Sequence, residues 1–364
     1  MSSLASSLTN GQSKTLSTRD FPPGVSGKPY VISSQDGEII YIPLSKSATR
    51  LLITGKETDN AFAVVSSGGS QSDPIGFHYH REAHDVFLCL QGSINVWAGD
   101  QCRTMSAGDF ASVPPNTIHQ YQILGVHSEM IGLIVPGGWE EFFRFIGEPY
   151  NGPMWPTSDN RNFFEVLLPR LKAAAEQFDM VPCPQQDPFE PQEWKDIDNQ
   201  LPGKQEPYFL KHASGPAYDV GGTICRPLVT TAESNGKFSI GSVESSSQFH
   251  QYSIFEKDNE SLCFENVHHA FMVVQGSIEF QLDLMGPRIF GASELIYVPK
   301  GTSFRFRTTS RFSKMYAFAS GAGLVEIFCK LGATHPTTVL PEKAESVSSA
   351  ALEALQSQFG FCRK

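Results

Sequence analysis

Short apolar runs separated by Gly, Pro, Asn and Asp make up most of the chain between Lys28 and Val135. Four of them follow one another: VFLCL, SINVWAGDQCRTM, FASVP and HQYQIL. Within the second, Gly99 and Asp100 stand between two arms in which apolar residues alternate with polar ones. A period of two is typical of strands, and a Gly-Asp pair suits a hairpin turn. The pattern predicts sequential antiparallel strands that form a barrel or a jelly roll.

Helical spacing of apolar residues begins at Trp139, in WEEFFRFIG and then in NFFEVLLPRLKAAAEQF (162–178). Pro169 inside the second stretch is expected to delimit or kink the helix there. The polar, proline-punctuated residues 182–207 predict a linker to a second unit. A further helical pattern, SSAALEALQSQFG (348–360), predicts a short amphipathic packing helix at the C-terminus.

The strand pattern returns after residue 208 with an internal repeat. LQGSINV (90–96) matches VQGSIEF (274–280) at an offset of 184 residues. GDFASVPPNTIH (108–119) has a fainter counterpart in ASELIYVPKGTSF (292–304), where Pro114 aligns with Pro299 at an offset of 185. Two matches in the same order at nearly the same offset favour a duplicated β-domain.

The 364 residues are enough for two domains that each bury a core. The expected plan of this all-β chain is an N-terminal arm (1–28), a first β-domain (29–138), a helical and proline-rich connector (139–207), a second β-domain (208–345) and a C-terminal helix (346–364).

Composition excludes several classes of partner. The net charge of −10 and the lack of any Lys/Arg block argue against nucleic-acid binding. No apolar run approaches eighteen residues, and the first twenty residues lack the apolar segment of a signal peptide, so we expect no membrane association and a cytoplasmic location. The seven cysteines are scattered without a Cys-x-x-Cys pair, which predicts reduced, mostly buried thiols.

HYHREAHD (78–85) concentrates groups that bind metals. His78 and His80 are two positions apart, so on a strand both imidazoles point to the same face. His119 follows 39 residues after His80, where the turn containing Asn116 would bring a later strand alongside the first. Three imidazoles and one carboxylate suit Zn, Cu, Fe, Mn or Ni.

The spacing of these residues resembles the two motifs of the cupin superfamily. His78-x-His80, four residues, Asp85, six residues and Gly92 follow the first motif, which usually has Glu in place of Asp. Gly108, five residues, Pro114-x-Asn116, two residues and His119 follow the second. The two motifs, the internal duplication and the residues of the segment GDFASVPPNTIHQYQ together resemble the fungal quercetin 2,3-dioxygenases, which are bicupins that cleave flavonols. The resemblance implies two cupin jelly-roll domains with the metal in the first.

The resemblance also implies the site. His78, His80, Asp85 and His119 would bind the metal, and Asp85 would be a ligand, a general base for the enolic hydroxyl of the substrate, or both. Asp85 is one methylene shorter than the usual Glu, and under the three-residue spacing of the motif His84 is the competing ligand.

Phe87 and Tyr121, each two residues beyond a predicted ligand, would line the pocket for a small aromatic substrate. The cofactor would be one divalent transition metal among Cu, Fe, Mn, Ni and Co, with Cu or Fe favoured, and O2 would be the co-substrate.

At the second repeat the motif residues are replaced. His269 stands at the position of the acid, and Leu262, Phe264 and Phe304 stand at those of the histidines. These side chains predict a second domain that does not bind a metal in the same way.

The leading hypothesis is a metal-dependent dioxygenase that cleaves the oxygenated ring of a flavonol or a related enolised aromatic polyketide. The alternatives are a non-oxidative isomerase, decarboxylase or ring-opening enzyme of fungal secondary metabolism, and a non-catalytic bicupin. Free strand edges of the cupin sheets could be covered by pairing in a homodimer.

Overall fold

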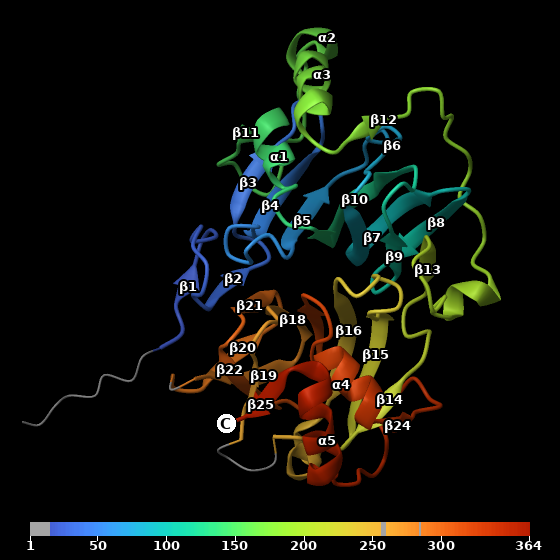
Figure 1. Ribbon diagram of the computed structural model, residues 1–364. Coiled ribbons are helices and arrows are strands. Elements are labelled where there is room, and N and C mark those ends of the chain that lie inside the picture. The colour runs from blue at the N-terminus through green and yellow to red at the C-terminus, as the bar shows by residue number, and fades with distance from the viewer. Residues whose placement is uncertain (1–14, 256–259, 284) are drawn as a thin grey trace, which may run out of the picture.

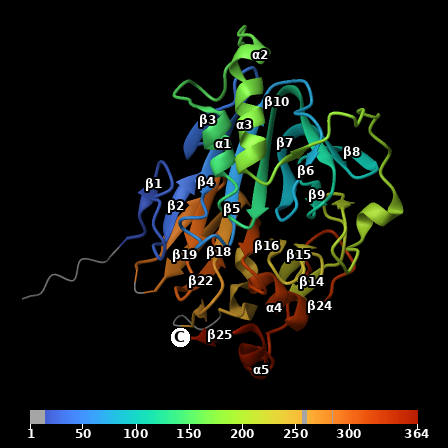
Figure 2. The same ribbon diagram turned by 45° about the horizontal axis from the view of Figure 1, so that its top comes forward.

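The computed structural model describes residues 15–255, 260–283 and 285–364, and in it two β-rich domains lie end to end (Figures 1 and 2). Of the predicted N-terminal arm, residues 1–14 lie outside the described residues. Strands outnumber helices in both domains, and nearly all strand pairs are antiparallel. The predicted all-β fold with two duplicated β-domains is confirmed.

The first domain is built on an 11-stranded sheet. Its strands are β3 (Glu38–Tyr41), β4 (Ser47–Ile53), β5 (Ala63–Gly69), β6 (His78–Tyr79), β7 (His84–Ala98), β8 (Gln101–Ser106), β9 (Phe110–Val113), β10 (His119–Val135), β11 (Glu148–Pro149), β12 (Val181–Pro182) and β13 (Tyr208–Leu210). Strands β7 and β8 are joined at Gly99 and Asp100, as the hairpin prediction required.

The second domain contains two sheets. The nine-stranded sheet consists of β1 (Thr18–Arg19), β2 (Tyr30–Ser33), β14 (Tyr218–Val220), β15 (Thr223–Val229), β16 (Ser239–Ser245), β18 (His269–Gln275), β21 (Glu294–Val298), β23 (Ser313–Ala319) and β24 (Ala333–Thr334). The five-stranded sheet consists of β17 (Leu262–Phe264), β19 (Ser277–Leu282), β20 (Arg288–Gly291), β22 (Ser303–Thr308) and β25 (Phe361–Arg363).

The helices form two groups, one on each domain (Figure 1). They are α1 (Glu141–Ile146), α2 (Phe163–Val166), α3 (Leu168–Gln177), α4 (Leu324–Leu331) and α5 (Ser349–Phe359), with 3-10 turns at Asp196–Asn199 and Ser247–Tyr252. The predicted helices in the connector and at the C-terminus are confirmed. Pro169 occupies the first turn of α3, where a missing N–H costs nothing, and so separates α3 from α2.

The two domains exchange strands. β2 lies at the start of the predicted first domain (29–138) but pairs with β21 of the second, with Tyr30 opposite Tyr297. β13 pairs with β9 of the first domain, with Tyr208 opposite Ser112. Both strands therefore pair outside the predicted domain in which they lie.

Three apolar layers follow from this arrangement. One fills the first domain, one fills the second, and a third, shared layer lies between them. Strand β7 shows how one sequence serves two layers: Phe87 and Cys89 face the interior of the first domain, whereas Val86 and Leu88 face the shared layer.

A pair of loops shows that the duplication extends beyond the repeat visible in the sequence. Glu57 and Glu233 each accept the backbone N–H of the threonine three positions earlier, at 2.8 Å in both domains. Glu140 and Glu326 each accept the N–H of the next loop residue, at 2.6 Å in both. The loops TGKETDNAF and TTAESNGKF thus form the same hydrogen bonds with little sequence identity.

All seven cysteines are free thiols, five of them buried, as predicted. Among the described residues, no helix combines the length and the apolar character needed to cross a membrane.

Candidate metal centre

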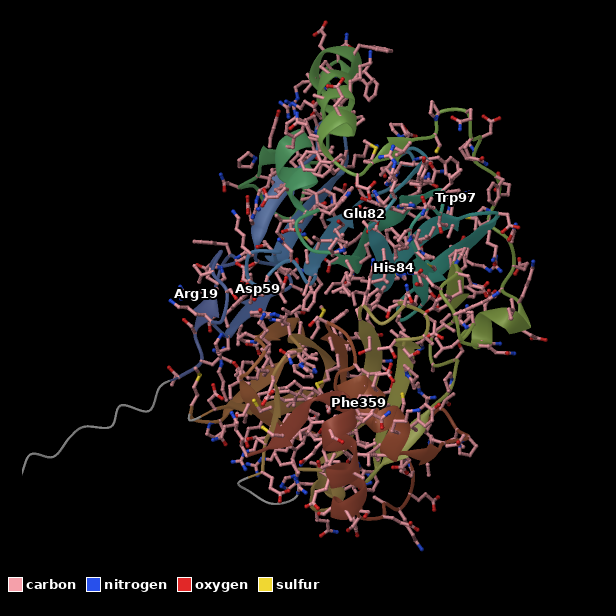
Figure 3. All side chains as sticks on the ribbon, in the orientation of Figure 1. Arg19, Asp59, Glu82, His84, Trp97 and Phe359 are labelled. Atoms are coloured by element: carbon pink, nitrogen blue, oxygen red, sulfur yellow. The ribbon has the colours of Figure 1, made fainter. Side chains whose placement is uncertain are left out.

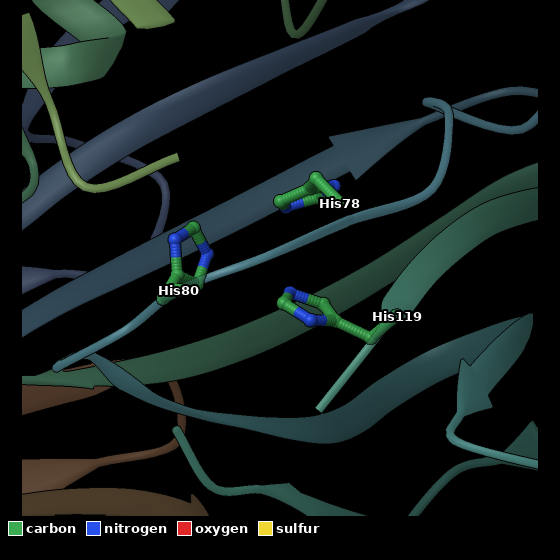
Figure 4. Close-up of side chains that lie close together, drawn as sticks. All are labelled: His78, His80 and His119. Carbon is green, nitrogen blue, oxygen red and sulfur yellow. The ribbon is translucent and has the colours of Figure 1, made fainter. Parts of the chain in front are cut away.

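Three histidines converge inside the first domain (Figure 4). His78 on β6 lies directly opposite His119, the first residue of β10, and His80 follows immediately after β6. The ring centroid of His78 lies 4.4 Å from that of His119 and 5.1 Å from that of His80. One potential ligand atom from each ring lies within 4.8 Å of the other two.

Backbone carbonyls fix the orientation of the three rings. The Nδ1 atom of His78 is 2.9 Å from the carbonyl oxygen of Gly76, and that of His119 is 2.9 Å from the oxygen of Thr117. Nδ1 of His80 is bonded to the carbonyl oxygen of Asp179. A carbonyl can only accept, so each Nδ1 carries the hydrogen and each Nε2 offers a lone pair, as metal-binding histidines require.

Several polar atoms at the point of convergence have no partner. Nε2 of His80, Nε2 of His119 and Oδ1 of Asp85 are buried and make no hydrogen bond. Each such atom costs about 1–3 kcal/mol when left unsatisfied. A cation would satisfy all of them, so the donor set fits one divalent transition metal ion.

Asp85 adjoins two of the three histidines. As the second residue of β7, it points into the domain, and its Oδ2 lies 3.3 Å from Nε2 of His80 and 3.4 Å from Nε2 of His119. Burial alone would raise the pKa of Asp85 and lower that of His80. Their mutual attraction outweighs burial, so the pKa of the carboxyl is held well below its usual range and the pKa of His80 is raised. The shorter acid therefore reaches its neighbours and stays ionised.

His84, the competing ligand, points the other way because it precedes Asp85 on the same strand. Its Nε2 is 2.8 Å from the hydroxyl oxygen of Ser112, and its ring packs edge-on against Phe238 of the second domain, 4.8 Å between centroids. Figure 3 shows His84 beside the domain boundary. Burial lowers the pKa of His84 to about 4. The structure thus places this residue in the shared layer and away from the three other histidines.

One residue that holds the site was missed in the sequence. Asp179 follows α3 in the connector, and besides its carbonyl bond to His80 its carboxylate accepts the N–H of Arg81 at 2.8 Å and of Glu82 at 2.7 Å. The indole N–H of Trp139 donates to the same carbonyl at 3.1 Å. Asp179 lies about a hundred residues from the loop that it holds and matches no motif, so nothing in the sequence pointed to it.

The two predicted pocket aromatics lie together beside the site. The rings of Phe87 and Tyr121 are 5.7 Å apart, and Phe87 is 6.3 Å from the ring of His119. The Tyr121 phenol lies beside Ser67, whose hydroxyl is 3.1 Å from that of Thr49. Burial raises the pKa of Tyr121 to about 12, so this phenol is neutral and can donate.

The second domain has less polar side chains at the positions that correspond to Thr49, Ser67 and Tyr121. Cys225 and Val243 face each other where the first domain has Thr49 and Ser67, and Phe306 stands for Tyr121. The interior of the first domain therefore contains three hydroxyl groups that the interior of the second domain lacks.

The motif positions of the second domain are packed with rings. Phe264 lies 4.6 Å from His269 and 6.1 Å from Phe304, and Nε2 of His269 accepts the N–H of Leu324 at 3.3 Å. Burial lowers the pKa of His269 to about 3. Within the described ranges, the three histidines of the first domain form the one group of donors that could hold a metal ion.

Comparison with known proteins agrees with the fold and with the motifs. Residues 64–133 match the cupin domain family. The chain is 36% identical to a quercetin 2,3-dioxygenase of Bacillus subtilis over 145 residues, which span 40% of this chain and 42% of that protein. It is 25% identical over 333 residues to a quercetin 2,3-dioxygenase of Aspergillus japonicus, covering 85% of this chain and 93% of that protein.

Among solved structures, an oxalate decarboxylase variant of Bacillus subtilis superposes with a TM-score of 0.50 at 14% identity, covering 82% of this chain and 78% of that one, which supports the fold alone. The match to the cupin domain family includes the three histidines of the first domain, and the solved structure supports a fold of two such β-domains. Over most of its length, the chain resembles the quercetin 2,3-dioxygenase of Aspergillus japonicus.

Proposed function

We propose that the protein is a metal-dependent dioxygenase that cleaves the oxygenated ring of a flavonol or a related enolised aromatic polyketide with O2. The observation that carries the proposal is the set of three imidazoles, two of them buried, whose Nδ1 atoms are bound to carbonyls and whose Nε2 atoms converge beside Asp85. Similarity to two quercetin 2,3-dioxygenases supports the substrate class.

His78, His80 and His119 would hold one divalent transition metal, which would supply Lewis acidity and a template for substrate and O2. Asp85 would accept the proton of the enolic hydroxyl, because it is ionised and its Oδ1 has no partner. The neighbours that keep it ionised also make it a weaker base, so short hydrogen-bond reach to the substrate is essential. Phe87 and Tyr121 would pack against the aromatic rings.

The test uses the purified full chain, loaded in parallel with Cu, Fe, Mn, Co or Ni and incubated aerobically with quercetin. We expect at least one metal form to bleach the near-visible band of quercetin with matching O2 uptake and release of carbon monoxide. His78→Ala and His119→Ala should lose both bound metal and bleaching, whereas His335→Ala, at a half-buried position of the second domain, should keep both. Metal-loaded protein that consumes no flavonol in any form would refute the substrate assignment.

A second candidate is a reaction without O2, an isomerisation or a decarboxylation. The pairing of Asp85 with His80 favours it, because a carboxylate beside an imidazole can pass a proton between two positions of a substrate. Oxygen dependence separates the candidates, since turnover under anaerobic conditions would exclude the dioxygenase and support proton transfer.

A further inference from the structure

The last strand of the chain places two cysteines face to face. β25 is an edge strand of the five-stranded sheet and pairs only with β17. In their antiparallel register, Cys362 lies directly opposite Cys263. Directly opposite residues project their side chains to the same face of a sheet, so the two thiols are neighbours.

The strand geometry is compatible with a covalent bond. Ser261 and Lys364 exchange both backbone N–H···O bonds, at 2.9 and 3.0 Å, and two residues along Cys263 and Cys362 occupy the next hydrogen-bonded pair. Such pairs have Cα atoms about 5.5 Å apart, within the usual range for disulfides. The Cβ atoms must approach by about 1 Å, which an edge strand with one neighbouring strand can allow.

The two thiols differ in access. Cys263 is buried, and its sulfur donates to the carbonyl oxygen of Gly301 at 3.3 Å. Burial raises the pKa of Cys263, so this thiol is a poor first nucleophile. Cys362 is only partly buried and can be reached from solvent. An oxidant would therefore react first at Cys362, and Cys263 would resolve the product.

We propose that Cys263 and Cys362 form a reversible disulfide with a low-molecular-weight disulfide, such as oxidised glutathione, as the oxidant. The Cys362 thiolate attacks the oxidant, giving a mixed disulfide and one reduced thiol. Cys263 then attacks the sulfur of Cys362 and displaces the second reduced thiol. The protein loses two hydrogen atoms, and the oxidant gains them. This inference is independent of the proposed function.

The bond would fasten the C-terminal segment to the second domain. Leu352 of α5 and Phe361 of β25 belong to the core of that domain, so the segment is already packed there. A cross-link between Cys362 and Cys263 would prevent β25 from separating from β17. Cys225 and Cys329 are also in contact, but Cys225 is fully buried on β15 between two neighbouring strands. That pair is a matched control, because Cys329 lies in α4 and Cys225 on a central strand held by neighbours on both sides, so the backbones cannot shift as an edge strand can.

The experiment exposes the full chain to oxidised glutathione, blocks the remaining thiols and maps the disulfides by mass spectrometry. We expect one cross-linked peptide pair joining Cys263 and Cys362, reversed by dithiothreitol, and hydrogen exchange in β25 slowed at least tenfold. Cys329→Ser should keep the cross-link, and Cys362→Ser should abolish it. The proposal would be overturned if Cys362 stayed free, if it retained only glutathione, or if the cross-link joined Cys225 to Cys329.

Discussion

Asp85 stands where the cupin motif usually has Glu, and its position on β7 makes up for the missing methylene. Its Oδ2 lies within 3.4 Å of two of the three imidazoles, yet its Oδ1 has no partner. One oxygen thus neighbours the histidines while the other is available to a substrate. This arrangement suits a general base held beside the metal more than a fully committed ligand.

Asp85→Asn tests that role. The amide keeps the size of the side chain but cannot accept a proton, so we expect turnover to fall by about 10²–10⁴-fold while the three histidines keep bound metal near the wild-type level. Asp85→Glu should stay within about tenfold of wild type, since it restores the usual residue of the motif and keeps the carboxylate. Turnover number and metal content of each variant are the measurements. Metal loss in Asp85→Asn as complete as in His78→Ala would show that the carboxylate is needed as a ligand.

We expect Tyr121 to be the residue through which the first domain distinguishes substrates. Tyr121, Ser67 and Thr49 form a cluster of three hydroxyls inside the first domain, and the second domain lacks this cluster. Tyr121→Phe removes one neutral hydrogen bond, about 1 kcal/mol, so we expect KM for a polyhydroxylated flavonol to rise about five- to tenfold. KM for a flavonol without further hydroxyls should not change. Equal effects on both substrates would mean that the phenol only packs.

The three candidate histidine ligands and their convergence were predictable from the sequence, because the side chains of an His-x-His pair on a strand point to one face. The carbonyls that orient the imidazole rings were not predictable. Gly76 and Thr117 are near in sequence but act through their backbone, which leaves no trace in the residue type. His84 and Asp85 were adjacent candidates, and only the register of β7 decides which of them faces inward.

The connector does more than join the two domains. β12 pairs with β6, and Asp179 just before it binds the loop between His80 and His84 through its carboxylate and its carbonyl. Sequence patterning correctly predicted the helices α1 to α3, because amphipathic spacing is local. It could not predict where the connector lies, because that depends on contacts between distant segments.

Asp179→Ala tests this support. The change leaves three backbone N–H groups of the loop without their acceptor, so the loop should loosen and the ring of His80 should lose its fixed orientation. Metal affinity should fall by about 10–100-fold, measured by competition with a chelator. Asp187→Ala, at an exposed position on the same connector, should leave affinity unchanged. Unchanged affinity in Asp179→Ala would show that backbone contacts alone hold the loop.

At the scale of the molecule, the two domains are less separable than their duplication suggests. The repeat was visible in the sequence, but the exchange of β2 and β13 was not, because YVIS and YFL have the composition of any buried strand and carry no mark of their partner. Each exchanged strand brings a tyrosine whose hydroxyl crosses to the other domain: Tyr30 donates to the carbonyl of Leu52 at 2.9 Å and Tyr208 to that of Leu228 at 2.6 Å.

Because the shared apolar layer and both exchanged strands would be lost together, the metal-free chain should unfold in one cooperative transition. Calorimetry should give equal calorimetric and van't Hoff enthalpies. Tyr30→Phe and Tyr208→Phe each remove one buried hydrogen bond across the domains and leave a carbonyl unpaired, so each should lower the free energy of unfolding by about 1–3 kcal/mol and shift the whole transition. Two separate transitions, with only one of them moved by each variant, would show that the domains fold independently despite the exchange.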